Sequence, residues 1–188
     1  MSDHEQQSDR GRGKVLEALA RAERKVFTRP APKSAKARMK FLRTREGGSN
    51  AAVAERRGTS RRTVERYLAG KLTKPQKRLQ AALVEETASE WQPQVRAQAR
   101  AQASTSSGMS VDVTAFGFTR TGSSDSRERQ ITTDISPFYV KQILVLQEAG
   151  AMDEELHPVV AEAITEWGTR ADGLRADFTA VSKIDFRF

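Results

Sequence analysis

The chain has 188 residues, of which 37% are hydrophobic, so it has room for two modest cores rather than one large core. It contains no cysteine, and its two histidines, His4 and His157, lie far apart. This composition excludes disulfides and thiolate ligands, and the histidine spacing is not that of a zinc site. No segment resembles a signal peptide or a membrane span of about 20 apolar residues, so we expect a cytoplasmic protein that does not bind membranes.

The positive charge is concentrated in the N-terminal half. Residues 21–80 hold 19 Lys and Arg against four acids, a net charge of +15, whereas residues 101–188 hold eight against 13, a net charge of −5. Such a basic segment attracts phosphate backbones by counterion release. The charge alone fits binding to DNA, to ribosomal RNA or to an anionic membrane surface. A sequence motif is needed to distinguish these partners.

The N-terminal half reads as a series of helices. Residues 1–13 are polar and predict a disordered tail, and apolar residues at three- to four-residue steps predict a helix over 14–27. Prolines at 30 and 32 break the pattern. Ser34 can cap a second helix through about Arg45, which Gly47 and Gly48 end.

Two further helices are expected before the hydrophobic pattern changes beyond residue 108. Thr73 followed by Gln76 is typical of a helix start, ahead of Leu79 and Leu83. Residues 91–108 predict a helix that runs into a flexible linker, because the segment from Ser104 to Gly108 is small and polar. We therefore expect a domain boundary near residue 104.

Beyond residue 108 the hydrophobic period changes from about four to two. This alternation predicts strands, and the intervening segments predict a turn and two helices. Val111, Val113 and Ala115 share one side of the first strand, and Phe116 and Phe118 are expected on the other. The expected elements are strands at 111–118 and 131–135 around a turn at 122–125, helices at 136–149 and 153–167, and a strand at 178–188.

Residues 50–68 have the spacing of a DNA-binding helix-turn-helix. Ala54 is small where two helices would cross, Gly58 can adopt positive φ after the first helix, and Ser60 can cap the second. The second helix of such a motif enters the major groove by its N-terminal end. The DNA-binding residues that we predict are Arg56, Arg57, Ser60, Arg61, Arg62, Arg66, Lys71, Lys74, Lys77 and Arg78.

The chain resembles the Tpg-type telomere terminal proteins of linear actinobacterial chromosomes and plasmids. The resemblance covers nearly the whole chain: its length, its basic N-terminal half with the motif at 50–68, and the segment from Gly108 to Phe118. It implies that the protein becomes covalently joined to 5′ DNA ends. In that reaction a threonine hydroxyl, here that of Thr114, primes the synthesis of the last nucleotides. The implied partners are telomeric DNA with its 3′ overhang and 5′ end, a telomere-associated protein and a DNA polymerase. The amphipathic strand at 178–188 also suits contact with another copy of the chain.

The implied role makes this protein a primer rather than an enzyme. A hydroxyl attacks the α-phosphate of a deoxynucleotide, and the Mg²⁺ ions that assist belong to the polymerase, so we expect no intrinsic cofactor. Without the resemblance, the hydroxyls of Ser104, Thr105, Ser106, Ser107, Ser110, Thr119 and Thr121 compete with that of Thr114. The resemblance also implies that the protein is associated with the nucleoid.

Three other functions compete with the role of a protein primer. Asp112 and Asp134 are carboxylates on predicted strands, but no third metal ligand follows at useful spacing. A serine recombinase needs a catalytic core for which the chain lacks room. The serious alternative is a helix-turn-helix transcription regulator whose residues 105–188 serve dimerisation or effector binding.

The sequence therefore predicts an α+β protein with two parts. A helical helix-turn-helix DNA-binding domain is expected at 14–90, and a small mixed domain for priming and protein interaction at 109–188.

Overall fold

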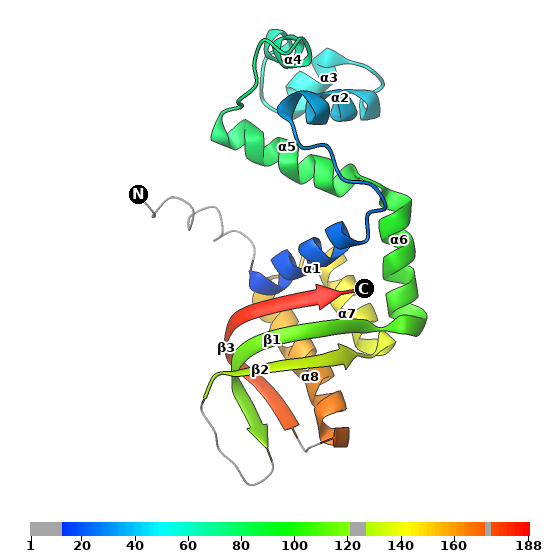
Figure 1. Cartoon of the computed structure of the whole chain (residues 1–188), viewed down its shortest axis with the longest axis vertical. Helices are drawn as coiled ribbons and strands as arrows, with labels where there is room; N and C mark the ends of the chain where they lie inside the picture. Colours follow the sequence, from blue (N-terminus) through cyan, green and yellow to red (C-terminus); the bar gives the residue numbers. More distant parts are fainter. Residues whose placement is uncertain (1–12, 121–126, 172–173) are drawn as a thin grey trace. The chain divides into compact units, whose positions relative to one another are not determined.

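A computed structural model describes residues 13–120, 127–171 and 174–188. The described part is mixed α+β, as the sequence predicts. It divides into two compact units, which are described separately. Unit 1 comprises residues 1–26 and 94–188, and unit 2 comprises residues 27–93. Their elements are labelled in Figure 1.

Unit 2 is built from short helices around a small apolar core. Its helices are α2 (Ala35–Arg45), α3 (Asn50–Arg56), α4 (Arg61–Leu68) and α5 (Lys77–Glu90). Serine side chains cap three of these helices: Ser34 accepts from the amide of Ala37, and Ser49 and Ser60 do the same for α3 and α4. The core consists of Ala35, Met39, Leu42, Val53, Ala54, Val64, Tyr67 and Leu83.

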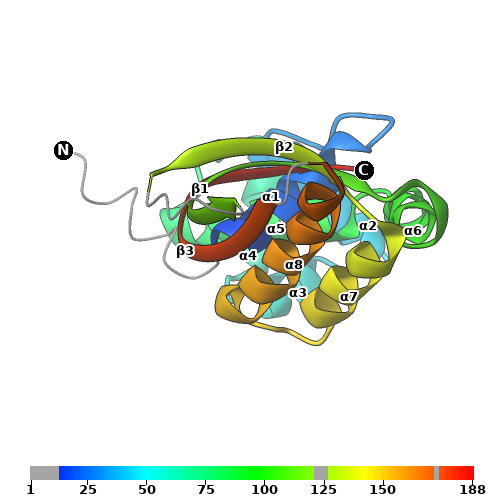
Figure 2. The same cartoon turned by 90° about the horizontal axis from the view of Figure 1, so that it is seen from below.

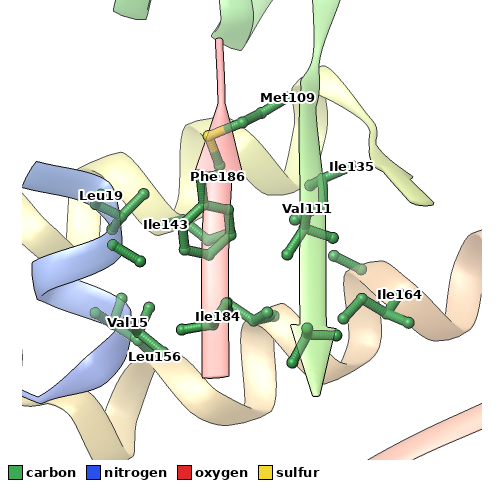
Figure 3. Close-up of a cluster of buried hydrophobic side chains, with 14 of the residues drawn as sticks. Val15, Leu19, Met109, Val111, Ile135, Ile143, Leu156, Ile164, Ile184 and Phe186 are labelled. Carbon is green, nitrogen blue, oxygen red and sulfur yellow. The ribbon is translucent and has the colours of Figure 1, made fainter. Parts of the chain in front are cut away.

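Unit 1 is a three-stranded antiparallel sheet with helices on one face. The strands β1 (Met109–Arg120), β2 (Arg129–Ile135) and β3 (Leu174–Arg187) lie in the order β2-β1-β3, so β1 is central. The helices are α1 (Lys14–Lys25), α6 (Pro93–Gln102), α7 (Pro137–Glu148) and α8 (Asp153–Ala171). Figure 2 shows α7 and α8 beneath the layer of strands. Figure 3 shows how side chains of α1, the strands and the helices meet in one core, among them Val15, Leu19, Val111, Ile143, Ile164 and Phe186.

The first helix belongs to unit 1, which corrects the domain that we expected at 14–90. The apolar stripe of α1, with Val15 and Leu19 fully buried, packs into the core of the sheet. The side chain of Asp153 at the start of α8 accepts from the amide of Leu16 at 3.0 Å and so caps α1 from another element. Periodicity identified the apolar face of this helix but could not identify its partner.

Basic side chains of α1 also cover the backbone edge of β3. The Lys14 ammonium donates to the carbonyl of Val181, and the Arg21 guanidinium donates to the carbonyl of Ile184 at 2.9 Å. Such cover satisfies carbonyls that an edge strand would otherwise leave free. Glu23, the one polar residue in the stripe of α1, is buried and pairs with Arg100 of α6.

The segment that we expected as a flexible linker is helical. After α6 the chain makes a π-helical turn, Ala103–Ser107, in which Ala103 is buried in the core. Gly108 follows with φ of 69°, and a Cβ there would collide with the carbonyl oxygen of Ile135. The boundary between the units therefore lies at residues 93–94 and not near 104. The small polar residues from Ser104 to Gly108 are compatible with a linker, but the burial of Ala103 holds this segment in a helical turn.

The strands confirm the predicted hairpin but depart from strict alternation. Val111, Val113 and Ala115 are buried as expected, whereas Phe118 is also buried instead of facing away. The pairing of β1 with β3 shifts between Phe116 and Phe118, where Gly117 has φ of 98°. This irregularity returns Phe118 to the core side and explains the wrong prediction.

Two smaller predictions were wrong in whole or in part, and two others fall on residues that the structure does not describe. Helix α5 begins at Lys77 with Gln76 at its cap position, so Thr73 does not cap it. The alternation after residue 178 predicts one face made of Phe178, Ala180, Ser182, Ile184, Phe186 and Phe188. Strand β3 begins at Leu174 and buries Val181, while Ala180 and Ser182 are exposed, so this prediction was partly wrong. The predictions of a disordered tail at 1–13, apart from Gly13 at the cap position of α1, and of a turn at 122–125 fall outside the described residues.

Candidate nucleic-acid interface and acceptor hydroxyl

Helices α3 and α4 are joined by a tight turn with the predicted geometry. Gly58 has φ of 55°, and the amide of Thr59 donates to the carbonyl of Ala54 at 2.9 Å. Ser60 then accepts from the amide of Thr63 at 3.1 Å and starts α4. Ala54 is 5% exposed, and Val53 and Val64 are fully buried. The small alanine, the left-handed glycine and the serine cap thus set the angle between the two helices.

The exposed face of α4 carries two arginines one helical turn apart. Arg62 and Arg66 are exposed, and neither forms an ion pair with any residue that the structure describes. Arg61 is also exposed, but its Nε donates to Glu65 at 2.9 Å on the same helix. The structure therefore distinguishes Arg62 and Arg66 as the arginines of α4 that are free to bind a ligand.

The loop after α4 holds more cations beside this helix. The chain turns at Gly70, with φ of 76°, and the amide of Lys71 donates back to the carbonyl of Arg66 at 2.9 Å. The buried Tyr67 donates its hydroxyl to the carbonyl of Lys74 at 3.3 Å. Lys71, Lys74, Lys77 and Arg78 are all exposed. These two hydrogen bonds hold Lys71 and Lys74 next to α4, whereas Lys77 and Arg78 stand in the first turn of α5.

Two of the predicted DNA-binding residues are engaged inside unit 2. The side chain of Arg57 has no exposed surface and pairs with Glu86 of α5. Burial lowers the pKa of the Arg57 guanidinium, and the neighbouring charge of Arg56 lowers it further. Arg56 donates to Glu46 and, at 3.0 Å, to Glu90. We therefore remove Arg57 from the predicted interface and regard Arg56 as a structural ion pair at its margin.

Charge in unit 2 is unevenly distributed between its surfaces. The unit holds 16 Lys and Arg against six acids, a net charge of +10, whereas unit 1 holds 16 against 18, a net charge of −2. Glu46, Glu86 and Glu90 pair with arginines on the α3 and α5 side of the unit. Positive charge that these acids do not balance therefore lies on α4 and the residues after it, and also on α2, where Lys36, Lys40 and Arg43 are exposed.

Thr114 lies on the sheet face opposite the helices. It stands in the middle of β1, with Gln130 of β2 and Lys183 of β3 as its cross-strand partners. Its side chain is half-buried, and its hydroxyl makes no hydrogen bond within the described residues. Asp112, two residues before it on the same face, accepts from the Gln130 amide at 3.0 Å. The hydroxyl thus has a carboxylate, an amide and an ammonium group as neighbours.

A β-bulge adjoins Thr114. Thr114 pairs with Lys183, but Ala115 pairs with Val181, so Ser182 is the extra residue of β3. A bulge bends its strand and changes the direction of nearby side chains, and bulges are frequent beside functional sites. Neither Ser182 nor Lys183 could be predicted as a neighbour of Thr114, because their proximity to it depends on strand register. Only the strand pattern after residue 178 hinted at them.

The competing hydroxyls are mostly engaged. Ser104 and Thr105 donate to the carbonyl of Ala101, Ser106 donates to that of Gln102, and Ser107 donates to that of Gly108. Ser110 is half-buried like Thr114 and makes no hydrogen bond within the described residues, Thr119 is exposed, and Thr121 lies outside the described residues. The segment before β1, which we expected to be a flexible linker, is a π-helical turn in which Ala103 is buried and residues 105–107 are exposed.

No protein-family model, curated protein or solved structure matches this chain. No helix in the described ranges is long and apolar enough to cross a membrane.

Proposed function

We propose that the protein binds DNA through unit 2, with α4 lying in the major groove. The observation that carries the proposal is a set of exposed cations on α4, on the following loop and in the first turn of α5 that have no ion-pair partner among the described residues, next to a glycine turn and a serine cap. A helix fits the major groove, and an arginine can bond a guanine there in bidentate fashion. Arg62 and Arg66 are the best candidates for base contacts, and Lys71, Lys74, Lys77 and Arg78 for phosphate contacts.

Two alanine variants test this division of roles. On a duplex selected by the protein from random sequences, Arg62→Ala should weaken binding by about 1–3 kcal/mol, because a bidentate base contact is lost. Lys74→Ala should weaken binding to selected and unselected duplexes by the same factor and reduce the salt slope by about one unit. Fluorescence anisotropy at several salt concentrations measures both effects.

The matched control is Lys141→Ala, which removes an exposed lysine from α7 of unit 1. It should leave binding to both duplexes unchanged. If Arg62→Ala and Lys74→Ala instead produce equal effects on every sequence, α4 does not read bases and the groove assignment is wrong.

We further propose that Thr114 is the acceptor of the first nucleotide in protein-primed replication of linear DNA ends. The resemblance to telomere terminal proteins motivates this step, and the unbonded hydroxyl beside a β-bulge supports it. Its oxygen would attack the α-phosphorus of a deoxynucleotide, forming a phosphoester while the bond to the β-phosphate breaks and pyrophosphate leaves. The partner polymerase supplies Mg²⁺ and accepts the proton.

The cross-strand neighbour of Thr114 fits this chemistry. Lys183 carries a positive charge opposite the hydroxyl, and such a charge stabilises a phosphate that approaches it. Asp112 is held by the Gln130 amide, which restrains its carboxylate next to the same hydroxyl. Detection of protein that stays on DNA 5′ ends after denaturation tests this proposal.

A transcription regulator is the second candidate, and one observation favours it. Thr114 stands in the middle of the central strand and is only half exposed, whereas a primer residue has to enter a polymerase cleft. In a regulator, unit 2 would bind an operator and unit 1 would pair with a partner. Such a protein would bind DNA as described above but would never carry a nucleotide.

A further inference from the structure

Helix α7 has an apolar surface on the side that faces away from the core. Tyr139, Val140, Ile143 and Leu144 point inward and are buried. Phe138 and Val145, seven residues apart and therefore on one side of the helix, are 65% and 55% exposed. Large apolar side chains that are exposed in a line along a helix indicate a surface that contacts another molecule.

Charged residues flank this line on one side only. Lys141 and Glu148 lie on the same flank of the helix, on either side of Val145 along its axis. Lys141 is exposed and forms no ion pair within the described residues. Glu148 accepts from Arg100 through Oε1, yet its side chain is 69% exposed, so its second oxygen is accessible.

We propose that α7 pairs with α7 of a second copy, antiparallel and about a two-fold axis next to Val145. Lys141 lies about 6 Å before Val145 along the helix and Glu148 about 4.5 Å after it. An antiparallel pair brings identical flanks together, so Lys141 of each copy reaches the level of Glu148 of the other. A parallel pair would place both charges opposite uncharged positions. The charged residues on this face of α7 are thus complementary to the same residues on a second copy.

The size of this surface makes the pair a weak one. A helix of 12 residues is about 18 Å long, and stable interfaces bury about 800 Å² per partner. One exposed face of α7 offers less. The contact therefore forms at high protein concentration, or when two copies are held next to each other, and dissociates readily otherwise.

The absence of native cysteine permits a direct test on the full chain. Val145→Cys places the sole thiol of each copy at the proposed axis, where mild oxidation should form an intermolecular disulfide. Glu154→Cys, at an exposed position of α8, is the matched control. At equal protein concentration, the Val145→Cys variant should form disulfide-linked dimer at least about five times faster than the control.

Second substitutions in the Val145→Cys background separate specific pairing from random collision. Lys141→Glu should slow cross-linking severalfold, because it turns both charge pairs repulsive. Phe138→Ser should leave the rate unchanged, because Phe138 lies about 10.5 Å before the axis, beyond the end of α7 of the partner. Thermal unfolding should be unchanged in both variants, since both side chains are exposed. Equal rates for Val145→Cys and Glu154→Cys, or no effect of Lys141→Glu, would overturn the proposal and leave the face for a different protein.

Discussion

Thr114→Val is expected to abolish covalent labelling of the protein by a deoxynucleotide. The assay combines the protein, a labelled deoxynucleotide, a telomeric template, Mg²⁺ and an extract of cells that maintain a linear replicon as the source of polymerase. Valine keeps the β-branched shape that suits a strand but lacks the nucleophilic oxygen. DNA binding by unit 2 should be unchanged, because Thr114 lies in unit 1.

Two comparisons make the labelling result specific. Thr114→Ser keeps a hydroxyl and should retain part of the labelling, and the phosphoester should survive mild hydrolysis that removes phosphohistidine or acyl phosphate. Labelling of Thr114→Val at the wild-type level would move the acceptor to another hydroxyl, with the exposed Thr119 first. If the wild-type protein is never labelled although it binds DNA, the protein is a regulator.

Glu86→Ala is expected to destabilise unit 2 by about 3–5 kcal/mol. Glu86 pairs with the Arg57 guanidinium, which is fully buried, so its removal leaves that charge without an ion-pair partner and with only the longer-range charges of Glu46 and Glu90. A unit of this size has little stability in reserve. Specific DNA binding should therefore be lost near 37 °C, although Glu86 does not lie on the proposed interface.

Urea unfolding followed by tryptophan fluorescence measures this effect. In a Trp167→Phe background, Trp91 is the single tryptophan, and its indole donates to the carbonyl of Arg29 within unit 2. The double variant Arg57→Met with Glu86→Leu removes both charges and should recover most of the lost stability. If Glu86→Ala unfolds at the wild-type urea concentration, the buried pair does not stabilise unit 2.

The parts of the structure that the sequence predicted rest on local chemistry. Ser34, Gly58 and Ser60 start or separate helices through bonds to residues at most five positions away, so their roles were visible in the chain itself. The alternation of Val111, Val113 and Ala115 likewise predicted which side of β1 is buried. These features were sufficient for the α+β class and for the α3–α4 segment.

The features that were missed depend on contacts between distant residues. Helix α1 joins unit 1 because of Asp153 and the sheet core, more than 100 residues away. Arg57 appears as one more cation in a basic sequence until α5 places Glu86 over it. The bulge at Ser182 arises from the pairing of β1 with β3, which periodicity alone cannot reveal.

We propose above all that unit 2 binds DNA through the cations of α4, of the loop after it and of the first turn of α5. The most direct test is the affinity of the full-length protein for a short duplex between about 50 and 200 mM NaCl. The four exposed cations assigned to phosphate contacts, Lys71, Lys74, Lys77 and Arg78, predict a slope of about −3.6 in log affinity against log salt, a loss of about 150-fold. No binding at 50 mM salt, or an affinity that does not change with salt, would contradict the claim.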